Sequence, residues 1–281
     1  MLLQLPRFER LGLVVVRKAL GQEGEQALRC HKGITMLHLQ QEHFPETEQE
    51  KITLLPSMEN LSKIKVLRLV DLFLPTKQLA QFLSHIIYEK ISIESLTLIR
   101  NYSKSLDNSL IGNMRDLGQA SQKLTKLSVN IAHVGARETR YFFEGLGFSG
   151  SKLKELVLSN LPNSSLRHTD LSALIKALEI TSISTLVLNS INLDQEQARS
   201  LFEQIQKGAS KLKNLSIFFE SFNNRTNHNQ VRTLDAALLA GALNRLEKVV
   251  LGNVNLNSQQ VEAVLREALG GTKLRELRVD R

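Results

Sequence analysis

A short hydrophobic pattern recurs along the whole chain, with apolar residues at the first, fourth and sixth positions of each copy. Leucine holds most of these positions, and isoleucine, valine or phenylalanine holds the others. The ten copies are Phe8-Leu11-Leu13, Ile34-Leu37-Leu39, Ile64-Leu67-Leu69, Ile93-Leu96-Leu98, Leu124-Leu127-Val129, Leu153-Leu156-Leu158, Ile183-Leu186-Leu188, Leu212-Leu215-Ile217, Leu246-Val249-Leu251 and Leu274-Leu277-Val279. Their first residues are 26, 30, 29, 31, 29, 30, 29, 34 and 28 positions apart. Such regular self-similarity indicates a repeat architecture.

One repeat, from Leu246 to Lys273, shows what a unit contains. Val249 and Leu251 flank a variable residue, and this alternation predicts a short strand. Apolar residues then recur at helical spacing, at Val261, Val264, Leu265, Ala268 and Leu269. A glycine pair follows, which favours the end of a helix. Each unit is therefore predicted to run strand, turn, helix and return.

Three other units have the same helical stripe. Its members are Leu79, Phe82, Leu83, Ile86 and Ile87 in one unit, Leu171, Leu174, Ile175 and Leu178 in another, and Ala198, Leu201, Phe202 and Ile205 in a third. A strand and a helix of this size cannot bury both of their faces alone. We therefore expect the units to stack strand on strand and helix on helix.

The chain resembles the leucine-rich repeat family, in its longer, helix-bearing subclass similar to ribonuclease inhibitor. The resemblance implies an α/β solenoid shaped like a horseshoe, with about ten strand-turn-helix units, a parallel sheet on the concave face and helices on the convex face. It covers nearly all of the sequence. We therefore expect residues 1–281 to form a single leucine-rich repeat domain, on its own or within a longer protein.

The turn after each strand departs from the family pattern, which places Asn or Cys three residues after the third apolar position. Those places here hold Leu72, Ala132, Leu161, Ile191 and Val254. Polar residues stand just before several of them, at Asp71, Asn160, Ser190 and Asn253. We therefore expect a remodelled turn.

Composition limits the compartment and the class of protein. The single cysteine, Cys30, excludes an internal disulfide and favours a reducing environment. No stretch approaches the length of a transmembrane helix, and Arg7, Glu9 and Arg10 interrupt the apolar N-terminus, which makes a poor secretory signal. We expect a cytoplasmic protein, or one in the host cytoplasm if it is a secreted effector.

The variable residues between the apolar positions are predicted to face the concave side, where a partner would bind. The candidate binding residues are His38, Arg68, Thr97, Ser128, Lys126, Asn189, Asn214, Phe218 and Lys248. This mixture of small, polar and apolar side chains suits protein recognition. It contains no row of aromatic residues for stacking bases, so nucleic acid is not the expected partner.

The chain carries a formal net charge of +8, and part of this charge recurs in register with the repeats. A basic residue directly precedes the first apolar position in six units, at Lys63, Lys123, Lys152, Lys211, Arg245 and Lys273. Another follows two places later in four units, at Lys65, Lys154, Lys213 and Arg275. Stacked about 5 Å apart, these residues would form a basic rim. Such a rim would attract an acidic protein, an anionic lipid surface or nucleic acid, but interspersed Glu155, Glu247 and Glu276 also fit a merely solvated edge.

The eighth repeat is the longest and contains the segment Phe218-Phe219-Glu220-Ser221-Phe222. An exposed pair of rings, Phe218 and Phe222, would be an anchor for a partner. Alternatively, the longer repeat folds these rings under its own loop. The sequence leaves both interpretations open.

The chain shows no arrangement typical of catalysis or cofactor binding. Cys30 and His31, with His38 and His43, lack the third group that positions a catalytic base and the fourth ligand of a zinc site. Gly145-Leu146-Gly147 lacks the rest of any nucleotide-binding pattern. We therefore expect no cofactor, no metal and no enzymatic activity.

These observations favour a non-enzymatic scaffold that presents a rigid concave surface to a protein partner. The first alternative is a binder of anionic lipid, as a minor membrane-surface role, or of nucleic acid through the basic rim. Two further alternatives come from the resemblance alone: a microbial effector acting on a host protein, and a regulator of small GTPases. The salt dependence of binding would distinguish the first alternative from protein binding on the concave face, because binding through a basic rim weakens steeply as the salt concentration rises.

The last predicted strand, from Leu274 to Val279, is followed by no further repeat in this sequence. An unpaired strand edge invites pairing with another chain. Either the natural protein continues into a cap, or the edge pairs with a second copy of the chain, or its arginine residues protect it. For the second case we predict self-association through this edge, to be measured by light scattering over a series of protein concentrations. A chain that stays monomeric throughout the series would contradict this prediction.

Overall fold

The computed structural model describes residues 10–15, 33–41, 61–70, 76–99, 113–130, 134, 136–147, 150–159, 168–191, 195–207, 211–219, 236–253, 258–269 and 273–280. Its strands form one 10-stranded parallel sheet in chain order, β1 to β10. The strands are β1 (Arg10–Val15), β2 (Met36–Gln41), β3 (Val66–Val70), β4 (Ser95–Ile99), β5 (Lys126–Asn130), β6 (Glu155–Ser159), β7 (Thr185–Ile191), β8 (Asn214–Phe219), β9 (Lys248–Gly252) and β10 (Glu276–Asp280). Each lies at one copy of the hydrophobic pattern, as predicted.

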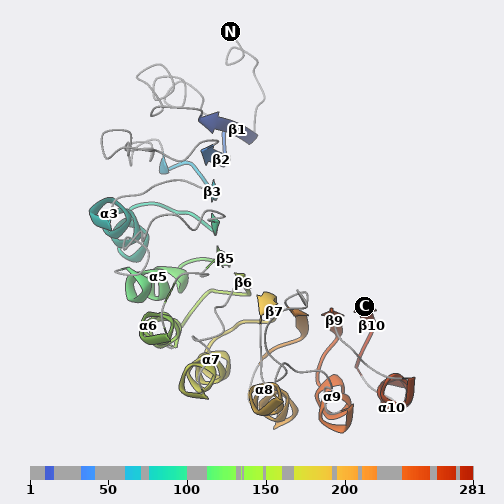
Figure 1. Cartoon of the computed structure of the whole chain (residues 1–281). Helices are drawn as coiled ribbons and strands as arrows, with labels where there is room; N and C mark the ends of the chain where they lie inside the picture. Colours follow the sequence, from blue (N-terminus) through green and yellow to red (C-terminus); the bar gives the residue numbers. More distant parts are fainter. Residues whose placement is uncertain are drawn as a thin grey trace, which may run out of the picture.

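The helices of the described residues lie together on one side of this sheet. They are α3 (Thr76–Ile87), α5 (Met114–Ser121), α6 (Ala136–Leu146), α7 (His168–Ile180), α8 (Gln195–Lys207), α9 (Ala236–Leu243) and α10 (Ser258–Leu269). Figure 1 shows the repeats as a curved row, with the strands on the inner side and the helices on the outer side. This α/β arrangement is that of a leucine-rich-repeat-like solenoid. None of these helices is long and apolar enough to cross a lipid bilayer.

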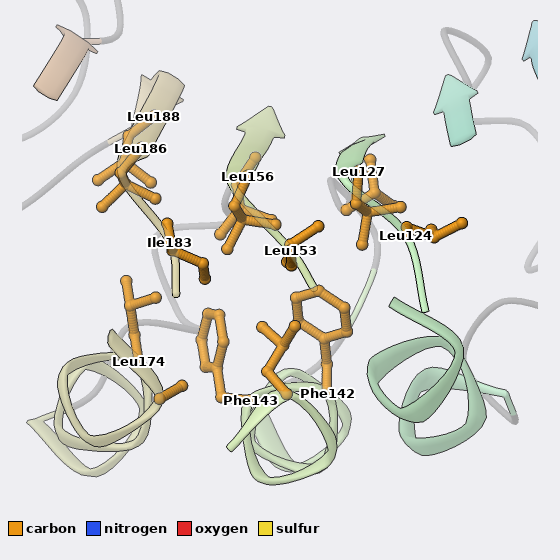
Figure 2. Close-up of a cluster of buried hydrophobic side chains, with 14 of the residues drawn as sticks. Leu124, Leu127, Phe142, Phe143, Leu153, Leu156, Leu174, Ile183, Leu186 and Leu188 are labelled. Carbon is orange, nitrogen blue, oxygen red and sulfur yellow. The ribbon is translucent and has the colours of Figure 1, made fainter. Parts of the chain in front are cut away.

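The strand leucines point toward the helices and build one continuous core. The apolar residues at the second and fourth positions of each strand from β2 to β9 are no more than 8% exposed. Figure 2 shows Leu127, Leu156 and Leu186 of three successive strands above Phe142 and Phe143 of α6. Their two rings lie 5.4 Å apart at an angle of 53°. Burying a side chain of this size stabilises the fold by about 1.5–3 kcal/mol.

A ladder of backbone hydrogen bonds holds successive repeats in register. The carbonyl group just before each strand accepts two N–H groups from the next repeat. For example, the Glu94 carbonyl accepts the N–H groups of Thr125 and Lys126, at 2.7 and 3.1 Å. The same pair of bonds is made by the carbonyl groups of Thr35, Lys65, Thr125, Lys154, Ser184, Lys213 and Glu247. Equivalent residues of successive repeats therefore stand directly beside one another.

The remodelled turn is visible where the strands β7 and β9 end. Ser190 and Asn253, the polar residues that precede the apolar substitutions, have φ angles of 50° and 58°. Asn tolerates this left-handed conformation better than most residues. Asn253 also donates a side-chain hydrogen bond to the Phe219 carbonyl group of the preceding repeat, at 2.9 Å. At this turn, Asn253, the polar residue one place before the apolar Val254, therefore hydrogen-bonds to the backbone of the neighbouring repeat.

The stripe predicted for α10 is only partly buried. Val264 is 1% exposed, but Leu265 is 46% exposed. The prediction that Leu265 belongs to the buried stripe was therefore wrong. Among the described elements, α10 packs against α9, and no second helix packs against α10.

The helices α5 and α6 approach so closely that their backbones touch at Gly118 and Gly145. A methyl group on Gly145 would lie 2.7 Å from the Arg115 carbonyl oxygen and 3.0 Å from the Gly118 Cα atom. Gln122 reaches across the same contact and donates a hydrogen bond to the Gly145 carbonyl group at 2.7 Å. Only glycine fits this approach, because a backbone cannot move aside as a flexible side chain can.

We predict that Gly145→Ala lowers the free energy of unfolding by about 1–3 kcal/mol, because it overpacks this helix contact. The matched control is Gly147→Ala, whose methyl group would be 3.5 Å from the nearest atom, the Phe143 carbonyl oxygen. The control should change stability by no more than about 0.5 kcal/mol. Urea denaturation of the two variants measures both effects, and equal losses would contradict the prediction.

Candidate functional site

The sheet face away from the helices, here called the open face, carries the predicted binding residues. The register aligns its side chains in three columns, formed by the first, third and fifth residues of the strands. The first column runs through Met36, Val66, Ser95, Lys126, Glu155, Thr185, Asn214, Lys248 and Glu276, the middle column through His38, Arg68, Thr97, Ser128, Val157, Val187, Ser216, Val250 and Arg278, and the last through Gln40, Val70, Ile99, Asn130, Ser159, Asn189, Phe218, Gly252 and Asp280. The variable positions that were predicted to face the concave side are thus the positions observed on the open face.

Polar residues of the first column pair with their neighbours on the next strand. Lys126 contacts Glu155 at 2.7 Å, and Lys248 contacts Glu276 at 2.7 Å. Asn214 donates a hydrogen bond to the Thr185 hydroxyl group at 3.0 Å. Lys126, Asn214 and Lys248 were predicted as binding residues, and all three are held by a partner on the open face itself. The column therefore offers oriented polar groups with little net charge.

The middle column consists mainly of short side chains. Thr97, Ser128 and Ser216 are partly exposed, and none of their hydroxyl groups bonds to another described residue. Arg68, at the β3 position of this column, is exposed and makes no ion pair within the described part of the chain. Within the described part of the chain, these groups keep their bonding capacity for a ligand placed against the sheet.

His38 of β2 lies beside Arg68 of β3, and the pKa of His38 is lowered from its ordinary value. Burial is the larger cause, because it disfavours the charged imidazolium, and the positive charge of Arg68 adds to it. The Nε2 atom of His38 is buried and has no hydrogen-bond partner among the described residues. His38 is therefore a predominantly neutral residue of the open face at neutral pH.

The last column brings an aromatic ring onto the open face. The Phe218 ring lies over Gly252 on the next strand, in the space that a side chain at position 252 would occupy. Phe218 is partly buried there, whereas Phe219 points the other way into the core and is 8% exposed. Asn189, the remaining predicted residue of this column, donates a hydrogen bond to Ser159 at 3.4 Å. Phe222 lies outside the described residues.

The packing of the Phe218 ring over Gly252 was not predicted from the sequence. The signal was present, because Phe218 and Gly252 each follow the third apolar position of successive repeats. An aromatic residue next to a glycine in such a column indicates a ring lying across the sheet.

The predicted basic rim lies at the edge of the sheet where the strands begin. Lys63, Lys123, Lys152, Lys211, Arg245 and Lys273 are all exposed, and so are Lys65, Lys154, Lys213 and Arg275. Three of these ten residues are in ion pairs, which join Lys65 to Glu94 at 3.1 Å, Lys123 to Glu89 at 2.7 Å and Lys213 to Glu247 at 2.8 Å. The other seven make no ion pair with another described residue.

Glu89 is a rim residue that sequence reasoning missed, because it stands before the hydrophobic pattern rather than within it. It follows α3 with a φ angle of 55°. The hydrogen bond and charge of Lys123, together with the charge of Lys152, hold the pKa of Glu89 below its usual value. Charges from three successive repeats therefore meet at this point of the rim.

The described residues contain no group of three or more His, Cys, Asp and Glu side chains that could hold a metal ion. Cys30, His31 and His43 lie outside these residues. Of the four residues considered together as a catalytic or metal site, only His38 belongs to the described part of the chain.

Comparison with known proteins gives little guidance on function. No family model and no curated protein matches the chain. A search of solved structures finds the chain similar to the actin-binding site 2 of leiomodin-1, with 15% sequence identity and a TM-score of 0.40, over 59% of this chain and 89% of that one. We draw no functional inference from a similarity at this level.

We predict that acid destabilises the chain partly through His38. The pKa of His38 is lower in the folded state than in the unfolded state. Its contribution to the free energy of unfolding is therefore fully present above its ordinary pKa of about 6.5 and is lost as the pH falls through the folded-state pKa. A His38→Gln variant should therefore lose less stability than the wild-type chain between about pH 7.5 and about pH 5.5. Urea denaturation at both pH values measures this difference, and equal losses would show that His38 makes no such contribution.

Proposed function

We propose that this protein is a non-enzymatic interaction module that binds a protein partner on the open face of its sheet. The observation that carries the proposal is the contrast between the columns of that face. Side chains of the first column are held by ion pairs and hydrogen bonds, while the hydroxyl groups of Thr97, Ser128 and Ser216 and the guanidinium group of Arg68 have no partner among the described residues. A face that combines pre-positioned and unused polar groups suits a partner with its own donors and acceptors.

Preorganisation supports the same proposal. The backbone ladder and the continuous core fix every column before a partner arrives. Binding then requires little ordering of the protein, so less of the interaction free energy is lost. Phe218, which lies partly exposed across Gly252, adds an aromatic contact of the kind found at the centres of protein interfaces.

Helices of 8 to 13 residues on the outer side support placing the chain in the helix-bearing subclass similar to ribonuclease inhibitor. The interpretations as a microbial effector or as a GTPase regulator, and the cytoplasmic location, remain predictions. They depend on the identity of the partner rather than on the arrangement of the sheet.

We predict that Arg68→Ala and Phe218→Ala each weaken capture of a specific partner by about fivefold or more, because each removes a contact on the open face. The chain would be immobilised, incubated with cell lysate, and the captured proteins quantified by mass spectrometry at several bait concentrations.

The matched controls are Arg266→Ala and Leu265→Ala, which change an exposed arginine and an exposed leucine on α10. These helical changes should leave capture of the same partner unaltered. If both open-face variants retained every partner of the wild-type chain, the open face would not be the binding surface.

A further inference from the structure

The positive charge of the basic rim is concentrated at one end of the solenoid. Toward the N-terminus, Lys65 and Lys123 are each paired with a glutamate, whereas Lys63, Lys152 and Lys154 make no ion pair with another described residue. In the seventh repeat, Ser182 and Ser184 occupy the two rim positions. In the last three repeats, five of the six rim positions are basic: Lys211, Lys213, Arg245, Lys273 and Arg275, here called the C-terminal basic cluster. The sixth position holds Glu247.

Glu247 is surrounded by members of the cluster from the repeats on either side. Lys213 of the preceding repeat contacts it at 2.8 Å. The hydrogen bond and charge of Lys213, and the charges of Arg275 and Lys273 in the following repeat, hold the pKa of Glu247 below its usual value. The Glu247 carboxylate thus interacts with three cations, but it forms an ion pair with Lys213 alone among the described residues.

The remaining charge of the cluster is exposed and close together. All five side chains are exposed, and Lys211 and Arg245 make no ion pair with another described residue. Equivalent residues on adjacent strands are separated by about 5 Å, a distance at which like charges repel one another. An anionic ligand that lies along the three repeats would remove this repulsion and release bound counterions.

We propose that the C-terminal basic cluster binds an acidic segment of a polypeptide. The inference rests on the proposed function, because it assigns chemistry to one part of the same protein partner. About three residues of extended chain cover the roughly 10 Å from the eighth repeat to the tenth. A short run of Asp or Glu residues would therefore be long enough to contact every member of the cluster.

Two observations favour a polypeptide over nucleic acid or a membrane. The cluster adjoins the first column of the open face, where Lys248 pairs with Glu276, so one protein can cover both surfaces. The rim positions of these three repeats contain no aromatic side chain on which a base could stack and no apolar side chain that could enter a lipid surface.

The test measures binding of a fluorescein-labelled peptide of alternating Glu and Asp to the full chain by fluorescence anisotropy at about 0.15 M salt, where the Debye length is about 8 Å. In the variant K211E/R245E/K273E, the affinity should fall by about tenfold or more, because three of the cations that contact the peptide are reversed. These three side chains make no ion pair among the described residues, so the fold should persist, and urea denaturation verifies this.

The matched control is K77E/R137E/K176E, which reverses three exposed basic residues on the helices α3, α6 and α7 and so changes the net charge equally. The control should alter affinity for the peptide by less than about twofold, since exposed charges beyond a Debye length are screened. An equal loss in the two variants would overturn the proposal, because attraction would then depend only on net charge.

Two other probes decide the class of partner. An oligothymidylate of the same charge and vesicles containing phosphatidylserine should bind more weakly than the peptide, and tighter binding of either would overturn the assignment to a polypeptide. The Arg68→Ala and Phe218→Ala variants should retain wild-type affinity for the peptide. The proposed peptide site at the cluster and the proposed partner site on the open face can therefore be disproved independently, each by its own experiment.

Discussion

Every repeat of this protein depends on its neighbours to bury its leucines, and the rest of the structure follows from that dependence. A strand of five residues offers two apolar side chains to the core, and a single helix cannot cover them from all sides. Leu127, Leu156 and Leu186 become completely buried because three successive strands and their helices share one interior. The stability of such a stack comes from the contacts between adjacent repeats.

Close stacking also determines the chemistry of the surface. The carbonyl ladder holds successive repeats in one register, so each surface side chain meets the equivalent side chain of the next repeat. Complementary neighbours form pairs, as Lys126 does with Glu155 and as Asn214 does with Thr185. Where neighbours carry the same charge, as Arg245 and Lys273 do, no such pair forms. Among the described residues, cations without an ion pair therefore remain where adjacent repeats carry like charges.

The strands and the columns of the open face could be predicted because they follow from one periodic pattern. Ten strands lie at the ten copies of the motif, and the variable positions of the motif align across the strands as the columns of the open face. Periodicity carries this information because strand pairing and burial of alternate residues repeat with it.

Features outside the period could not be predicted in the same way. Glu89 pairs with Lys123 through a turn that follows a helix, and the position of that turn depends on tertiary packing. Leu265 has the spacing of a buried residue, yet its exposure depends on whether another element lies beside α10. The hydrogen bond from Asn253 to the Phe219 carbonyl group depends on a left-handed backbone conformation that no hydrophobic pattern encodes.

The eighth and ninth repeats bring the different surface chemistries of the protein together. The Phe218 ring can lie across the sheet only because Gly252 has no side chain, and this places an apolar patch in the last column. The middle column beside it holds Ser216 and Val250, the first column holds the neutral pair of Lys248 and Glu276, and beyond that lie the exposed cations of the rim. A ligand crossing from the last column to the rim would thus meet an aromatic ring, an oriented ion pair and an excess of positive charge in turn. Such a gradient across one rigid sheet can select both the partner and its orientation, because a reversed ligand would place its apolar part over the cations.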